Sequence, residues 1–143
     1  MKQISLALLV LVCCTALTTS TLAQCDKTIV VTSSKTEYLD IAGAIKKVIG
    51  EKTVIEITQT SITISPESDH TMTGAILSVN CTWKMAFREG KSEFKTIFKE
   101  NDESKPITIT LEGKDGKISF LAVFDDAPDK RIRVWADSFG EKK

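Results

Sequence analysis

The chain has 143 residues and equal numbers of basic and acidic residues, 19 of each. This length predicts a single domain, which can bury roughly two thirds of its unfolded surface and so needs neither metals nor several disulfides to form a core. Because there is no excess of positive charge, and Lys and Arg are spread along the chain, we expect no nucleic-acid partner.

The first 23 residues have the three parts of a secretory signal peptide. A basic start, Met1–Gln3, is followed by an apolar run over residues 4–17 and a small, polar stretch that ends at Ala23. The apolar run is short for a spanning helix, and no later run approaches that length. We predict cleavage after Ala23 and one domain over residues 24–143, secreted or periplasmic. An uncleaved amino-terminal anchor is the alternative.

Export decides how the cysteines are interpreted. Cys13 and Cys14 would leave with the signal peptide, so the mature chain would keep Cys25 and Cys81. An even pair in an oxidising compartment predicts one disulfide. The bond would close a loop of about 55 residues, for which chain-entropy models give about 4 kcal/mol. Since no Cys-x-x-Cys motif is present, a reactive thiol pair is the weaker interpretation.

Two modifications stay open as alternatives. Residues 22–25, Leu-Ala-Gln-Cys, are similar to a bacterial lipobox, although Gln24 replaces the small residue expected before the cysteine. A lipid anchor through Cys25 is therefore the alternative localisation. Asn80-Cys81-Thr82 matches the glycosylation sequon, but a bonded Cys81 within a strand would make it a poor acceptor.

The amino-terminal part of the mature chain predicts one strand and one ambiguous segment. Thr28–Ser34 is rich in β-branched residues and is expected to be the first strand, followed by a mixed connection up to Leu39. Residues 40–50 fit a helix with Asp40 as its N-cap and Gly50 after its end, or a hairpin that turns near Asp40. We prefer the hairpin because the surrounding sequence is strand-like.

From Lys52 onward, apolar and polar residues alternate with the period of two that is typical of strands. Short strands are predicted within residues 53–64, 73–87, 94–98, 107–112, 118–124 and 131–136. The strongest turn signal is Gly113-Lys114-Asp115-Gly116. Eight or nine strands joined by short turns predict an all-β antiparallel meander, closed as a barrel or, alternatively, folded as a β-sandwich.

The segment Cys81–Phe98 is expected to form the central hairpin of this meander, with its turn near Gly90. Strand parity assigns one inner face to Cys81, Trp83, Met85 and Phe87, and another to Phe94, Thr96 and Phe98. Ala75, Leu77 and Val79 keep the parity of Cys81, so the same face is expected to begin there.

Large apolar side chains on these faces are the candidate ligand-binding residues: Trp83, Met85, Phe87, Phe94 and Phe120. In the simpler interpretation they fill the core. In the other, a barrel open at one end uses them to line a cavity for a small apolar ligand, and about eight strands permit either outcome. Trp135, with Arg131 and Arg133, is expected to face outward as a possible binding surface.

No residue pattern predicts catalysis, a metal site or a cofactor. His70 is the only histidine and is expected in a solvated loop, which leaves little basis for a Ser-His-Asp or Cys-His site. Asp125, Asp126 and Asp129 match no calcium-loop spacing. We therefore expect a protein that is not an enzyme and binds neither a metal nor a cofactor.

With its strands placed, the chain resembles the small exported lipocalin-like domains of Gram-negative bacteria. The resemblance rests on the signal peptide followed by Cys25, the strand Thr53–Ile57, the run Cys81–Trp83 and the hairpin Thr108–Lys117. It implies a lipocalin-like barrel. We expect a monomeric, non-catalytic protein that binds a small apolar ligand or a protein of the cell envelope. The alternatives are a structural or inhibitory module that acts through its surface around a filled core and, third, a hydrolase.

Overall fold

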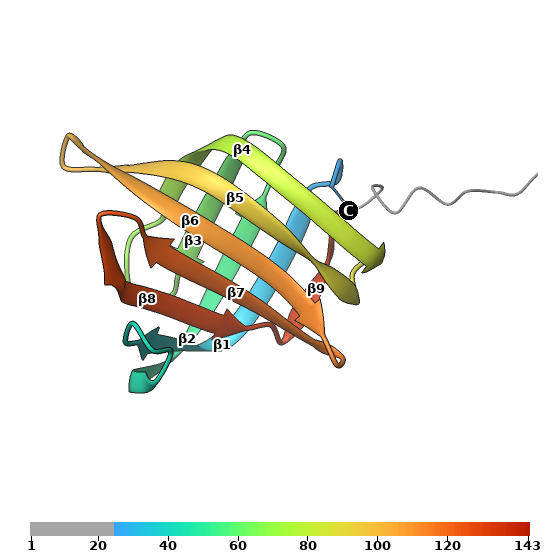
Figure 1. The fold of residues 1–143 in the computed structure, drawn as a ribbon, viewed down its shortest axis with the longest axis horizontal. Coiled ribbons are helices and arrows are strands. Elements are labelled where there is room, and N and C mark those ends of the chain that lie inside the picture. The colour runs from blue at the N-terminus through green and yellow to red at the C-terminus, as the bar shows by residue number, and fades with distance from the viewer. Residues whose placement is uncertain (1–24) are drawn as a thin grey trace, which may run out of the picture.

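The computed structural model describes residues 25–143, and strands make up most of this part of the chain (Figure 1). The predicted signal peptide, including Cys13 and Cys14, lies outside the described residues. No helix within residues 25–143 is long and apolar enough to cross a membrane. The strands are β1 (Ile29–Leu39), β2 (Ile45–Ile57), β3 (Ser61–Pro66), β4 (Met72–Met85), β5 (Glu89–Glu100), β6 (Glu103–Lys114), β7 (Lys117–Phe124), β8 (Ala127–Trp135) and β9 (Ser138–Glu141).

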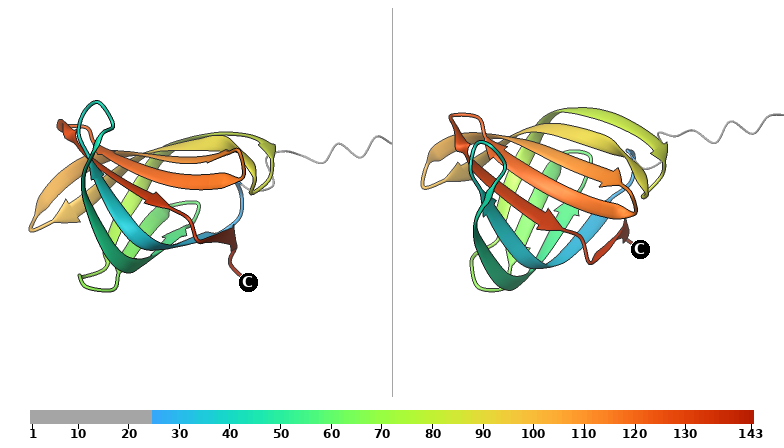
Figure 2. Two further views of the ribbon diagram at one scale, coloured as in Figure 1. Left: turned by 90° about the horizontal axis from the view of Figure 1, so that it is seen from below. Right: turned by 60° about the horizontal axis from the view of Figure 1, so that its bottom comes forward.

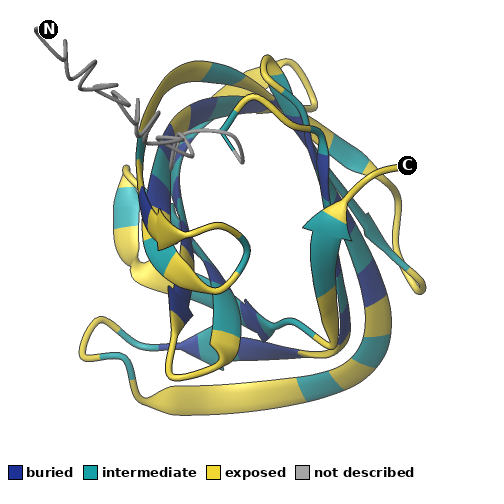
Figure 3. Ribbon diagram, turned by 90° about the vertical axis from the view of Figure 1, so that its right-hand side faces the viewer, coloured by how far each residue is buried: buried dark blue, intermediate teal, exposed yellow. Residues whose placement is uncertain are grey.

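Strands β1 to β8 form a closed antiparallel barrel. Each strand pairs with the next one along the chain, and β8 returns to pair with the second half of β1, from Thr36 to Leu39. The short strand β9 pairs with the first half of β1, from Ile29 to Thr32. Figure 3 looks along this barrel and shows the strands encircling a common interior. The predicted all-β antiparallel meander is confirmed, in its barrel form rather than as a sandwich.

The ambiguous segment over residues 40–50 is a hairpin, as preferred from the sequence. Asp40 Oδ1 accepts hydrogen bonds from the backbone N–H groups of Ala42 and Ala44, both at 2.9 Å. Gly43 takes a φ of +85°, which a residue without a Cβ adopts at little cost. This side-chain-capped turn joins β1 to β2, so Ile45, Val48 and Ile49 belong to β2 and not to a helix.

Strand β1 is longer than the sequence suggested. It runs through the expected connection to Leu39, with an irregularity in its pairing to β2 between Ser33 and Lys35. Before this bulge the buried residues have odd numbers, and after it Thr36 takes over the inner face. The shift hides the period of two, which is why residues 35–39 showed no clear pattern.

The core follows from the alternation of inward and outward side chains along each strand. Every strand from β1 to β8 contributes to it. Its buried members are Ile29, Val31, Ile55, Ile57, Ile62, Trp83, Phe94, Phe98, Ile107, Ile109, Leu111, Phe120, Ala122 and Val134.

Strand β4 departs from the predicted parity. Its register with β5 shifts between Ile76 and Ser78, which inserts one extra residue into the strand. Leu77 is consequently 64% exposed and Ala75 is exposed as well, so the prediction that these two share the face of Cys81 is wrong. Val79 lies on the same side of the shift as Cys81 and pairs with Phe94, so it keeps the predicted parity although it is 52% exposed. A bulge interrupts the period of two, so residues on its two sides no longer share a face as simple counting assigns them.

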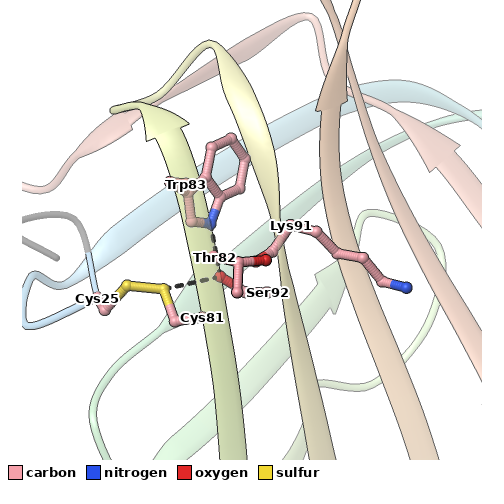
Figure 4. The surroundings of a disulfide bond; sticks show 6 residues. All are labelled: Cys25, Cys81, Thr82, Trp83, Lys91 and Ser92. Atoms are coloured by element: carbon pink, nitrogen blue, oxygen red, sulfur yellow. Dashed lines mark hydrogen bonds between the residues drawn. A yellow bond between two sulfur atoms is a disulfide. The ribbon is translucent and has the colours of Figure 1, made fainter. Parts of the chain in front are cut away.

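A disulfide between Cys25 and Cys81 ties the segment before β1 to β4, as predicted, with the two Cα atoms 6.3 Å apart (Figure 4). Ser92, on β5, lies beside the bond: its Oγ is 3.3 Å from Cys81 Sγ and 2.7 Å from Trp83 Nε1. A disulfide sulfur carries no hydrogen, so the Ser92 hydroxyl donates to Cys81 and accepts from the indole. This polar chain fixes Trp83 near the end of the barrel where the described chain begins.

Candidate functional site: the barrel cavity and its mouth

The barrel contains a cavity of about 580 Å³ that opens at one end. The turns that surround the opening join β1 to β2, β3 to β4, β5 to β6 and β7 to β8. These turns lie at the left in Figure 1 and in both views of Figure 2, opposite the C-terminus. The volume falls within the range of roughly 300–1,000 Å³ that is usual for small-molecule sites. We call this opening the mouth.

Most of the cavity wall below the mouth is apolar. Strands β5 to β8 place alternate side chains into it, and β3 and β4 add two more. These residues are Phe98, Ile107, Phe120, Ala122, Phe124, Ile132, Val134, Ile64 and Met72.

The wall formed by β1 and β2 is different because it carries oxygen atoms. Thr36 and Tyr38 of β1 and Glu51 and Thr53 of β2 line the cavity together with isoleucines. Thr53 is only 4% exposed, and its Oγ1 is a buried oxygen without a hydrogen-bond partner in the described chain. The cavity therefore has one polar side and one apolar side.

Two pairs of titratable side chains in contact lie at the mouth. In the β3–β4 loop, Asp69 Oδ1 accepts from the backbone N–H and lies 2.7 Å from the Nδ1 of His70. The backbone hydrogen bond, followed by the side-chain one, lowers the pKa of Asp69. At the β5–β6 turn, Lys105 Nζ lies 2.8 Å from Glu100 Oε2, which lowers the pKa of Glu100 and raises that of Lys105.

These pairs form one rim rather than two unrelated contacts. Asp69, His70, Glu100 and Lys105 all line the opening of the same cavity, although the two loops are about thirty residues apart in sequence. Beside them, the Ser68 hydroxyl donates to a carboxylate oxygen of Glu51. The mouth is therefore lined by ionised and hydrogen-bonding groups, while the deeper cavity is mainly apolar.

The structure distributes the five predicted ligand-binding residues over both ends of the barrel. Phe120 lines the cavity, and Phe94 is buried in the core outside the cavity lining. Phe87 is partly buried against Phe139, with ring centroids 5.3 Å apart, at the end away from the mouth. Met85 is 52% exposed after a second register shift in β4, so its assignment to the inner face is wrong.

Trp83 closes the barrel at the end opposite the mouth. A Cβ on Gly90 would lie 2.4 Å from Trp83 Cα, and one on Gly113 would lie 2.9 Å from Trp83 Cζ3. The tryptophan therefore packs directly on two glycines, with the ring of Phe139 6.0 Å away. A shallow, charged groove runs over the outside of this end, lined by residues 81–84, 89–91 and 112–114.

The sequence interpretation missed the polar wall and the rim. Thr36 and Tyr38 were placed in a connection, and His70 was placed in a solvated loop without a role. The available signal was positional: residues just before a turn and of inward parity will line the end of a barrel. That signal can be used only once the bulges are known.

No group of three or more His, Cys, Asp or Glu side chains within residues 25–143 is arranged to hold a metal ion. The architecture, an eight-stranded antiparallel barrel with a short ninth strand, is compatible with a lipocalin-like fold. Comparison with known protein families, with curated proteins and with solved structures finds no match for this chain.

Proposed function

We propose that this protein is an exported, non-catalytic carrier whose barrel cavity binds one small, largely apolar ligand. The observation that carries the proposal is the open cavity of about 580 Å³ with its apolar wall on β5 to β8. Barrels of eight strands are just wide enough to hold one small ligand when side chains do not fill them. Burial of the ligand's apolar surface would provide most of the affinity.

Export is supported by the signal-peptide pattern and by the Cys25–Cys81 disulfide, since such bonds persist mainly in oxidising compartments. The same sulfur of Cys25 cannot carry both a disulfide and a lipid. The disulfide therefore favours a free secreted or periplasmic protein over a lipid-anchored one. The resemblance to the exported lipocalin-like domains of Gram-negative bacteria is part of this proposal.

The other candidate functions have less support. A surface module with a filled core would not need the cavity that opens between the mouth turns. For a hydrolase, we would look for a carboxyl group whose pKa is raised toward neutral pH. The carboxyls with a shifted pKa at the mouth, Asp69 and Glu100, are instead held ionised by neighbouring groups.

The proposal can be tested by native mass spectrometry of the mature protein, purified gently from the envelope fraction of its host. We expect an additional mass that is lost on denaturation, on a polypeptide that lacks the two thiol hydrogens. A matched pair of variants strengthens the test. Ala122→Phe fills the cavity and should abolish the additional mass, whereas Ala75→Phe, at an exposed position on β4, should retain it. A bare polypeptide from every preparation would contradict the proposal.

A further inference from the structure

We propose that the ligand is amphipathic across its width, with an apolar side against β5 to β8 and a hydroxyl or carbonyl oxygen that bonds to Thr53. This inference rests on the proposed function, since it specifies the chemistry of the molecule in the same cavity. It is carried by two independent observations: the unequal walls of the cavity and one buried hydroxyl without a partner.

The walls differ in the chemistry they offer. Across the cavity from the apolar strands, β1 and β2 present three hydroxyls, on Thr36, Tyr38 and Thr53, and the carboxylate of Glu51. A purely apolar ligand would bury the hydroxyls of Thr36 and Tyr38 without compensation and would leave Thr53 Oγ1 unpaired, at a cost for each group. A ligand with an oxygen on the matching side would avoid that cost and would bind in one orientation.

Within residues 25–143, Thr53 carries the fully shielded side-chain hydroxyl that lacks a hydrogen-bond partner. Thr96 Oγ1 donates to the carbonyl of Ile107 at 2.7 Å, and Ser33 Oγ donates to the carbonyl of Lys35 at 2.9 Å. Ser92 is bonded to the indole of Trp83. Thr53 Oγ1 has no such partner in the part of the chain that the structure describes, although Val would fill the same space without a polar atom. Buried polar groups are nearly always paired, so this one points to a partner that binds from the cavity.

A bond from Thr53 to a ligand requires a change of its side-chain rotamer. In the free protein its oxygen is shielded from solvent while the residue itself lines the cavity. Rotation about χ1 exchanges the hydroxyl with another staggered position on Cβ. A threonine hydroxyl both donates and accepts, so it suits a ligand hydroxyl or carbonyl oxygen.

A pair of matched small molecules tests the inference. 2-Naphthol and 2-methylnaphthalene have the same rings and nearly the same size, but only the first carries a hydroxyl. We expect the wild-type protein to bind both and to prefer 2-naphthol. Thr53→Val should weaken the binding of 2-naphthol by about tenfold and leave 2-methylnaphthalene unchanged. Titration followed by the fluorescence of the naphthalene rings provides the dissociation constants.

Two control variants separate a ligand contact from a general effect. Thr53→Ser keeps the hydroxyl and should keep the preference for 2-naphthol. Thr110→Val makes the same substitution on β6, where Thr110 lies between the inward residues Ile109 and Leu111 and so faces away from the cavity. It should alter neither dissociation constant. In urea, Thr53→Val should leave the unfolding midpoint unchanged or raise it, because an unpaired buried hydroxyl is removed, whereas Thr96→Val should lower it because a bonded hydroxyl is lost.

The outcomes distinguish this inference from the proposed function. If both molecules bind but Thr53→Val leaves their ratio of affinities unchanged, the hydroxyl is not a ligand contact and the inference is overturned. The carrier function would stand in that case. If neither molecule binds the wild-type protein up to its solubility limit, the cavity does not take such ligands and both proposals fail.

Discussion

Trp83 was a candidate ligand-binding residue, but in the structure it is a core residue that closes one end of the barrel. It is 3% exposed, packs on Gly90 and Gly113, and donates to Ser92. We expect Trp83→Ala to lower the free energy of unfolding by about 3–5 kcal/mol, because it removes buried apolar surface and leaves a cavity. Urea unfolding measures the change.

Trp135 provides the matched control for this prediction. It lies on the outer side of β8 with the guanidinium of Arg133 5.1 Å from its ring centre. Trp135→Ala should cost much less, about 0.5–1 kcal/mol for the lost cation–π contact plus a small packing effect. Equal losses for the two variants would mean that Trp83 does not close the barrel as described.

The positions of individual site residues were predictable only in strands where no register shift interrupts the alternation of inward and outward side chains. Phe120 lies in β7, whose register with β6 is continuous, and its inward position was expected correctly. Met85 follows a register shift that apolar counting cannot detect, and it is exposed. Thr53 carries no sequence signal at all, because an unpaired hydroxyl is a property of its three-dimensional surroundings.

At the scale of elements, the disulfide joins a segment outside the strands to β4 and should act mainly on stability. Replacing both Cys25 and Cys81 by Ser should cost up to about 4 kcal/mol, since the unfolded chain would lose the constraint of a long closed loop. Thermal unfolding with and without reductant measures the difference. Reductant should destabilise the parent protein and leave the double variant unchanged.

The same double variant tests whether the two ends of the barrel contribute independently to ligand affinity. The disulfide lies beside Trp83 and Ser92, while the cavity opens at the other end. While the variant is folded, its affinity for a cavity ligand should therefore stay within about twofold of the parent's, because distant sites contribute nearly independently. A large loss of affinity in the folded variant would show that the closed end shapes the cavity.

Strands and turns were more predictable than their boundaries. The hairpin from β6 to β7 has a continuous register, and its turn at Asp115 and Gly116 takes the positive φ values that such a sequence favours. The second half of β1 and the middle of β4 were misjudged, since a bulge changes the face of every later residue. Bulges depend on how strands must curve to close the barrel, which is a property of the whole sheet.

For the whole molecule, the carboxyl groups at the mouth predict that the free energy of unfolding changes with pH only at acidic pH. Asp69 and Glu100 both have a lowered pKa in the folded protein. A carboxyl of this kind contributes stability above its unfolded pKa, and the contribution is lost as the pH falls through the folded value. We expect the melting temperature to be constant from about pH 7 to about pH 5 and to decline below about pH 4.

Thermal unfolding over this range checks the prediction, and Glu100→Gln should reduce the decline because it removes one of the two carboxyls. Both groups are exposed, so the effect should be small and should weaken further in high salt. A decline that is already present between about pH 5 and pH 7 would point to groups outside the rim.

The barrel itself follows from a pattern spread over the whole chain, whereas the cavity does not. Alternation over many strands requires a closed or stacked sheet, and it predicted the meander without any single decisive motif. Whether the interior is filled depends on how side chains from all the strands meet. Here Phe98, Phe120 and Phe124 line the cavity walls without filling it.

Both ends of the described chain lie at the end of the barrel opposite the mouth, and this arrangement has a practical consequence. The described chain begins at Cys25 and ends at Lys143 on the side away from the mouth turns (Figure 1). A tag, a fluorescent protein or a surface linker attached at either end would therefore leave the entrance unobstructed. Immobilised copies would present their openings to the solution, and a fused reporter could follow ligand uptake from outside without competing for the cavity.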